Sequence, residues 1–162
     1  MLTQRRLREV LHYEPLTGRF TWLISVGGVS KGSLAGRIKR EGYREIGVDG
    51  KLYRANRLAW LYMTGSWPAQ QVDHENLNKS DDTWMNLREA TYGQNQMNTA
   101  VRSNNKLGVK GVSIEPRTGR YVARIRINGK SRHLGTFDTA VLAQAAYEMA
   151  AVKEVGEFAR SE

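Results

Sequence analysis

The chain has 162 residues, of which 40% are hydrophobic, and this is enough to build one ordinary domain or two small ones. Lysine and arginine outnumber aspartate and glutamate by 25 to 16, so the formal net charge of +9 favours a polyanionic partner, with nucleic acid first. The absence of cysteine excludes disulfides, thiolate zinc sites and thiol catalysis, and no apolar run is long enough to cross a bilayer.

The first predicted element is a short helix near the N-terminus. Thr3 can cap it, and Leu7, Val10 and Leu11 then fall on one apolar face at helical spacing. We expect the helix to end before Pro15. The stretch MLTQRRLREVLHYE lacks the apolar core of a signal peptide, so a cytoplasmic protein with no membrane partner is expected.

A turn-rich β region follows this helix. TGRFTW places Phe20 and Trp22 on one face of a strand. The dipeptide Asp49-Gly50 is a strong signal for a two-residue turn and predicts a hairpin over residues 43–54. The segment RLAWLYM then has the pattern of a buried helix, which Gly65 ends.

The charge is unevenly distributed along the chain. Residues 1–57 carry a net charge of +7 and residues 101–162 a net charge of +5, whereas residues 58–100 carry −3. A locally acidic centre between basic flanks suits a cation site placed against a phosphate backbone. Chance clustering of charges would give the same pattern.

The acidic centre contains VDHENLNKSDDTWMNLREATYGQNQMN, which starts at Val72 and surrounds His74 with carboxylates and amides. Metal-assisted cleavage of a phosphodiester needs a base for water and a cation for the developing charge, and neutral imidazole is a suitable base. On a strand, Asp73 and His74 would point to opposite sides, so one could bind metal while the other reaches water. The spacing alone is also compatible with an ordinary polar loop.

This stretch closely resembles the HNH nuclease family, in the branch whose last signature residue is asparagine and which includes phage and intron-encoded homing endonucleases. Asp73 and His74 match the aspartate-histidine pair of the signature. Asn86 matches its middle asparagine, and Asn95 its last position. The resemblance implies that His74 is the general base, that Asp73 and Asn95 hold one divalent metal, and that Asn86 braces the histidine loop. Mg²⁺ is the expected metal, and Mn²⁺ could substitute.

The implied fold is α+β, with a ββα-metal arrangement of a β-hairpin and a helix cradling the metal, and NLREAT opening the helical region. The match extends upstream through YEPLTGRFTW and GYREIGVDGKLYRANRLAW, so residues 1–98 are expected to form one HNH nuclease domain.

Two positions depart from the family pattern. NRL at residues 56–58 stands where relatives usually have HRL, and DDT at residues 81–83 where they usually have DNR. Asn56 could weaken the site if the usual histidine fixes the core or touches DNA, and an extra acid at Asp82 would repel phosphate. A catalytically silent, sequence-specific DNA-binding protein is therefore the alternative function.

Residues 99–108 show little periodicity and are predicted to be a linker, after which a compact pattern resumes. The alternation in residues 121–127 and the dipeptide Asn128-Gly129 predict two strands joined by a two-residue turn. This turn pairs Arg124 with His133 on one face of the sheet. The other pairs in this register are Ile127 with Lys130 and Arg126 with Ser131.

The opposite face of this sheet, with Ala123, Ile125 and Leu134, needs an apolar cover. The alanine-rich segment that starts near Asp138 predicts a helix that supplies it.

Residues 109–162 look like a plant ethylene-response-factor (Apetala) type of DNA-binding domain, chiefly in LGTFDT and AAYEMAAVKEVGEFA. In that family a three-stranded antiparallel sheet enters the major groove and one helix packs behind it. Between Lys106 and Arg132 there are eight basic residues and one acidic residue, which fits such a face. A solvated sheet face is the alternative. The candidate DNA-contacting residues are Lys110, Ser113, Arg117, Arg124, Arg126, Ser131 and His133.

These observations predict a two-module, metal-dependent DNA endonuclease of the HNH type, acting as a monomer on double-stranded DNA and cutting one strand at a time. An RNA-binding protein is less favoured because the predicted sheet lacks exposed aromatic pairs for base stacking.

Overall fold

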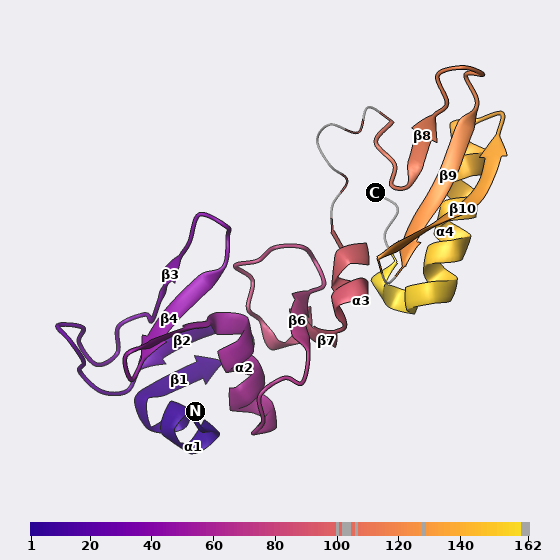
Figure 1. Ribbon diagram of the computed structural model, residues 1–162. Coiled ribbons are helices and arrows are strands. Elements are labelled where there is room, and N and C mark those ends of the chain that lie inside the picture. Colours follow the sequence, from indigo (N-terminus) through magenta and orange to yellow (C-terminus); the bar gives the residue numbers. More distant parts are fainter. Residues whose placement is uncertain (100, 102–104, 106, 128, 160–162) are drawn as a thin grey trace. The chain divides into compact units, whose positions relative to one another are not determined.

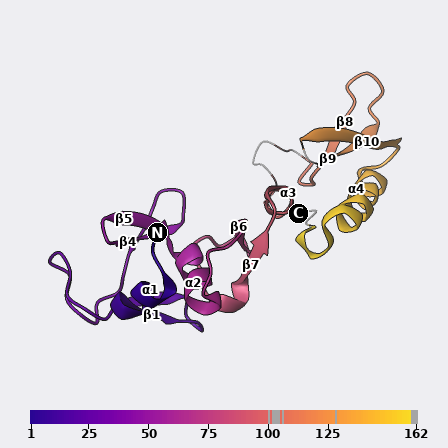
Figure 2. The ribbon, with the colours of Figure 1, turned by 60° about the horizontal axis from the view of Figure 1, so that its bottom comes forward.

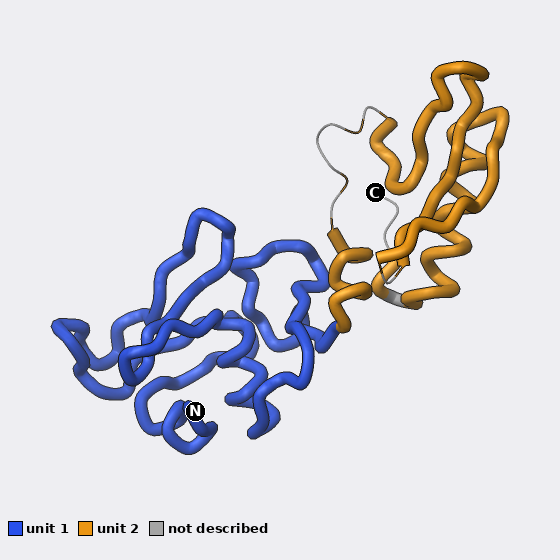
Figure 3. The backbone as a smooth tube through the Cα atoms, viewed as in Figure 1, with its two compact units in different colours: residues 1–90 blue, residues 91–162 orange. Residues whose placement is uncertain are grey.

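The computed structural model describes the chain except residues 100, 102–104, 106, 128 and 160–162. The fold is α+β and divides into two compact units, residues 1–90 and 91–162 (Figure 3). Much of the predicted linker at residues 99–108, and the turn residue Asn128, lie outside the described residues. None of the helices in the described ranges has the length and apolar character needed to cross a membrane.

The first unit contains two helices and four strand pairings (Figure 1). Its elements are α1 (Gln4–Val10), β1 (Leu11–Glu14), β2 (Arg19–Trp22), β3 (Arg37–Ile38), β4 (Arg44–Val48), β5 (Lys51–Arg54), α2 (Ala55–Thr64), β6 (Gln71–His74), a 3₁₀ turn (Trp84–Asn86) and β7 (Leu87–Ala90). β1 pairs with β2, β4 lies between β3 and β5, and β6 pairs with β7, all antiparallel.

Helix α1 begins as predicted, because the Thr3 side chain accepts a hydrogen bond from the backbone N–H of Arg6. It ends at Val10, so the prediction that Leu11 continues the helical face is wrong. Leu11 is the first residue of β1 and pairs with Trp22. Its side chain is fully buried all the same, because the change from helix to strand keeps it directed at the core.

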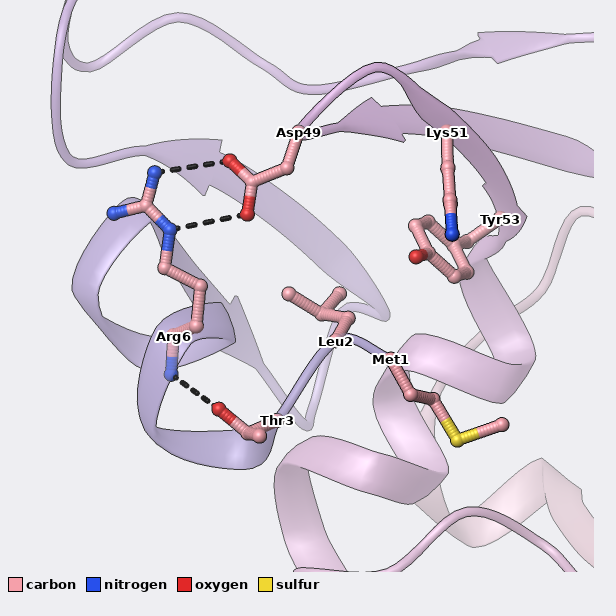
Figure 4. A pocket seen from close by; sticks show the side chains of 7 residues that line it. All are labelled: Met1, Leu2, Thr3, Arg6, Asp49, Lys51 and Tyr53. Atoms are coloured by element: carbon pink, nitrogen blue, oxygen red, sulfur yellow. Dashed lines mark hydrogen bonds and ion pairs between the residues drawn. The ribbon is translucent and has the colours of Figure 1, made fainter.

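The hairpin of β4 and β5 confirms the prediction made from Asp49-Gly50. Both turn residues have positive φ, 48° and 75°, as the two-residue turn requires. The Arg6 side chain forms two hydrogen bonds with the Asp49 carboxylate, which join α1 to this turn beside a small cavity of about 210 Å³ (Figure 4).

Helix α2 is the hub of the first unit, because it packs against α1, β4, β5 and β6. Leu58 and Leu61 are buried on its inner face, and Gly65 ends it in a left-handed conformation, as predicted. Asn56 is buried at its start, where its side-chain amide donates to the backbone carbonyl of Val72 in β6. The helix thus holds the strand that carries the Asp-His pair.

The β1–β2 hairpin contacts the backbone of a segment far along the chain. The buried Tyr13 hydroxyl donates to the carbonyl of Asp82 at 2.6 Å, and the Trp84 N–H donates to the carbonyl of Pro15. Burial raises the pKa of Tyr13, and the charge of Asp82 adds to this, so the hydroxyl remains a donor. Gly18 lies against the same backbone with φ 69°.

The second unit is a three-stranded sheet with a helix on one face (Figure 2). Its elements are α3 (Tyr92–Met97), β8 (Val112–Ile114), β9 (Tyr121–Ile127), β10 (Lys130–Phe137), α4 (Ala140–Val155) and a 3₁₀ turn (Gly156–Phe158). The predicted pairing of Arg124 with His133 is confirmed, and a bulge follows between His133 and Gly135. Helix α4 covers Ala123 and Ile125, as expected.

The expectation that NLREAT opens a helix is wrong. Leu87–Ala90 is strand β7, and α3 starts only after Thr91, which forms a reciprocal capping box with Gln94. Helix α3 belongs to the second unit, where Met97 packs with Tyr147 in the core.

We expect Gly18→Ala to destabilise the protein by more than about 2 kcal/mol, because a Cβ here would overlap the Asp82 carbonyl carbon and lie 2.5 Å from the Thr83 nitrogen. Gly28→Ala is the matched control, since Gly28 has φ 84° and open space around it, and should cost only about 1 kcal/mol. Urea unfolding measures both, and equal losses would contradict the close approach.

Candidate active site

The hairpin of β6 and β7 places the Asp-His pair at the end of its first strand. Asp73 lies opposite Arg88 and His74 opposite Leu87 in the antiparallel register. As neighbours on a strand, the two side chains leave on opposite faces. Both are buried, with 5% of Asp73 and 3% of His74 exposed.

His74 contacts a buried carboxylate. Its Nε2 lies 3.0 Å from Oδ1 of Asp82, which is 2% exposed. Asp82 is therefore a buried carboxylate directed at the imidazole, and the expectation that it repels phosphate stays a prediction. The ring of Tyr43 packs near the imidazole, with centroids 5.9 Å apart.

Asn86 bridges the loop between β6 and β7. Its side-chain oxygen accepts from the N–H of Asn76 at 2.9 Å, and its amide nitrogen donates to the carbonyl of Asp81 at 2.7 Å. Its own carbonyl accepts from the N–H of Glu75. The side chain of Asn86 thus joins Asn76, two residues after His74, to Asp81 on the other side of the loop.

Asp81 anchors the same loop through its side chain, which accepts hydrogen bonds from Thr83 and from the amide of Asn76. Burial acts to raise the pKa of Asp81, but these hydrogen bonds and the nearby His74 outweigh it, so the pKa lies below the usual value for aspartate.

Asp73 accepts a hydrogen bond from Arg88 Nε at 3.2 Å, across the hairpin. In the described ranges, no three histidine or acidic side chains cluster as a ready-made metal cage. Mg²⁺ does not need one, since it is commonly held by one or two carboxylates, waters and the substrate phosphate. The carboxylate of Asp73 and the amide oxygen of an asparagine are hard donors of the right type.

Asn95 lies on α3 and is therefore described with the second unit, half-buried one turn after the Thr91 cap. The first unit brings Asp73, His74 and Asn86 together on one hairpin and its loop.

Two cations lie over the ring of Tyr43, the ring that packs near the imidazole of His74. The guanidinium of Arg54 is 4.1 Å and the ammonium of Lys79 is 5.1 Å from the ring centroid. These two side chains place positive charge close to the acidic segment, where it would favour a phosphodiester.

In the second unit, five of the seven predicted DNA-contacting residues share one face of the sheet. They are Ser113, Arg124, Arg126, Ser131 and His133, all exposed. Arg117 lies in the exposed turn before β9. Lys110 differs, because its amine donates to the backbone carbonyl of Met97.

A cavity of about 520 Å³ lies in the second unit, lined in part by Lys110, Arg124, Arg126, Gln96 and Tyr147. Arg120 and Arg132 differ from Arg124 and Arg126 because each forms an ion pair with an acidic side chain. Arg120 pairs with Asp138 at 2.9 Å, and Arg132 pairs with Glu154 of α4 at 3.0 Å.

Two residues of the site were missed by the sequence analysis as contributors. Asp82 contacts His74, and Tyr13 in turn donates a hydrogen bond to the backbone carbonyl of Asp82, so both residues reach the site only through tertiary contacts.

Comparison with known proteins identifies the family of the chain. A family model for the HNH endonuclease matches residues 53–97. The chain is 30% identical over 152 residues to "Uncharacterized HNH endonuclease L560" of Acanthamoeba polyphaga mimivirus, covering 91% of this chain and 79% of that protein. The chain belongs to the HNH endonuclease family.

A solved structure described as "DNA binding and cleavage by the HNH homing endonuclease I-HmuI" is also similar, with 19% sequence identity and a TM-score of 0.42. That match covers 89% of this chain and 84% of the other.

We expect Asp81→Asn to remove an acid-sensitive part of the stability. Because the folded pKa of Asp81 is lowered, its contribution is fully present above about pH 4 and is lost as the pH falls through the folded value. The urea midpoint of the variant should therefore fall less than that of the wild type below about pH 4. Parallel curves for the two proteins would contradict the assignment.

Proposed function

We propose that this HNH endonuclease is a metal-dependent, homing-endonuclease-like enzyme that hydrolyses phosphodiester bonds of double-stranded DNA. The observation that carries the proposal is the Asp73-His74 pair at the end of β6, in a loop that Asn86 bridges. The family signature that these residues match, and the membership of the chain in the family, support it.

In this proposal His74 takes a proton from water, and the resulting hydroxide attacks phosphorus while one P–O bond of the backbone breaks. Asp73 and Asn95 are the residues that would hold a divalent ion, with Mg²⁺ favoured by the oxygen donors. When bound, the ion neutralises the charge that develops on the phosphate and the leaving oxygen. Asn86 keeps the loop after His74 in place.

We propose the second module as the DNA-targeting part, of the ethylene-response-factor type, with residues 1–98 as the nuclease domain and 109–162 as the reader. The exposed face with Arg124 and Arg126 supports this, because arginines on a strand can contact phosphates or guanine edges. Tethering the two modules makes the second DNA contact effectively intramolecular.

A single centre in a monomer cuts one strand at a time. We therefore expect supercoiled plasmid to become nicked circles in the presence of Mg²⁺ or Mn²⁺ and to stay intact in EDTA. Immediate linear product at low protein concentration would contradict nicking by a monomer, and no product with any metal would favour a silent DNA-binding protein.

We expect His74→Ala to abolish nicking, by at least about 100-fold, while DNA affinity stays within a few-fold of the wild type. The reason is that His74 is 3% exposed and would act on water rather than add to the binding surface. Nicking rates and fluorescence anisotropy measure the two effects. Loss of binding in this variant would contradict the division of labour between the modules.

We expect the double variant Arg124→Ala and Arg126→Ala to weaken DNA binding and to reduce the slope of log affinity against log salt by up to about 2. The matched control is Arg120→Ala with Arg132→Ala, which removes the same charge from arginines that pair with Asp138 and Glu154. Equal salt slopes for the two double variants would remove the sheet face from the interface.

A further inference from the structure

The imidazole of His74 and the carboxylate of Asp82 form a buried pair in the first unit. Nε2 and Oδ1 are 3.0 Å apart, and the two side chains are 3% and 2% exposed. At this depth a hydrogen bond is less weakened by water, so the contact between the two side chains has a strong influence on their orientation.

The backbone of Asp82 is fixed from the β1–β2 side. The Tyr13 hydroxyl holds its carbonyl, and Gly18 lies so close that no side chain fits between them. The next segment is tied by the Trp84 N–H to Pro15. The carboxylate therefore cannot withdraw from His74 without moving the hairpin.

This arrangement costs stability. In the described part of the chain, Oδ2 of Asp82 is buried without a hydrogen-bond partner. A buried acceptor left in this way costs about 1–3 kcal/mol, and more when it is charged. An apolar side chain of similar size would avoid that cost, so packing alone does not explain an acid at this position.

We propose that Asp82 is a positioning residue for His74: its Oδ1 accepts a hydrogen bond from the protonated Nε2, so that the neutral ring keeps its lone pair on Nδ1. The bond fixes both the tautomer and the rotation of the ring, as a carboxylate commonly does for a functional histidine. The catalytic part of this inference rests on the proposed function, in which Nδ1 takes the proton from water. The placement of the proton does not.

The first test is ¹⁵N NMR of protein labelled at histidine, without metal or DNA, at alkaline pH where imidazole is neutral. The chain has three histidines, and His74→Gln assigns the signal of His74. We expect a single tautomer with the proton on Nε2 in the wild type, whereas the exposed His12 and His133 show the mixture of a free imidazole. A proton on Nδ1, or a mixture at His74, would overturn the proposal.

The second test compares variants for cleavage and binding. Asp82→Leu should lower the single-turnover nicking rate by about 10- to 100-fold with unchanged DNA affinity, because the acceptor for Nε2–H is lost. Asp82→Asn should keep the rate within a few-fold, since its amide oxygen can still accept the bond. Glu75→Leu, which removes the same charge from an exposed neighbour of His74, is the control.

The outcomes separate this inference from the proposed function. A wild type that cuts no DNA but shows the Nε2–H tautomer refutes the nuclease and upholds the placement of the proton. The role of Asp82 alone is refuted if the wild type nicks DNA and Asp82→Leu nicks it equally fast. It is also refuted if Asp82→Asn nicks DNA as slowly as Asp82→Leu.

Discussion

The site depends on one hydrogen bond between segments far apart in the sequence, from the Tyr13 hydroxyl to the backbone carbonyl of Asp82. It is buried, and the Tyr13 ring packs on Phe20 at 4.7 Å, so the donor is held by the aromatic core as well as by the bond. A polar loop such as the one between β6 and β7 has little apolar surface of its own to define its shape. The first hairpin supports this loop at Asp82, whose carboxylate contacts His74.

Local turn chemistry made much of the fold predictable. The positive φ demanded by Asp49-Gly50 fixed the hairpin of β4 and β5. The alternation in β9 fixed which residues share a face, and the two-residue turn expected from Asn128-Gly129 gave the register that pairs Arg124 with His133. These features are determined by interactions between residues close in the sequence, and the tertiary contacts are compatible with them.

Features set by distant contacts were not predictable. Leu11 satisfies a helical apolar pattern and a strand pattern equally, and only its pairing with Trp22 decides between them. The direction of Asp82 depends on the Tyr13 hydroxyl in the same way. Asn56 could be judged only from its surroundings. Its amide is buried and bonded to Val72, so this departure from the family pattern supports the strand of the site.

Helix α3 carries Asn95, the last residue of the family signature, yet its Met97 lies in the core of the second unit with Tyr147 and Ile125. The amine of Lys110 also holds the last carbonyl of this helix. The end of the signature and the rest of the second unit therefore share one core, so the second unit cannot be replaced without affecting helix α3. A chimaera that joins the first unit to a different second unit must either bring along the residues that pack on Met97 or supply equivalent ones.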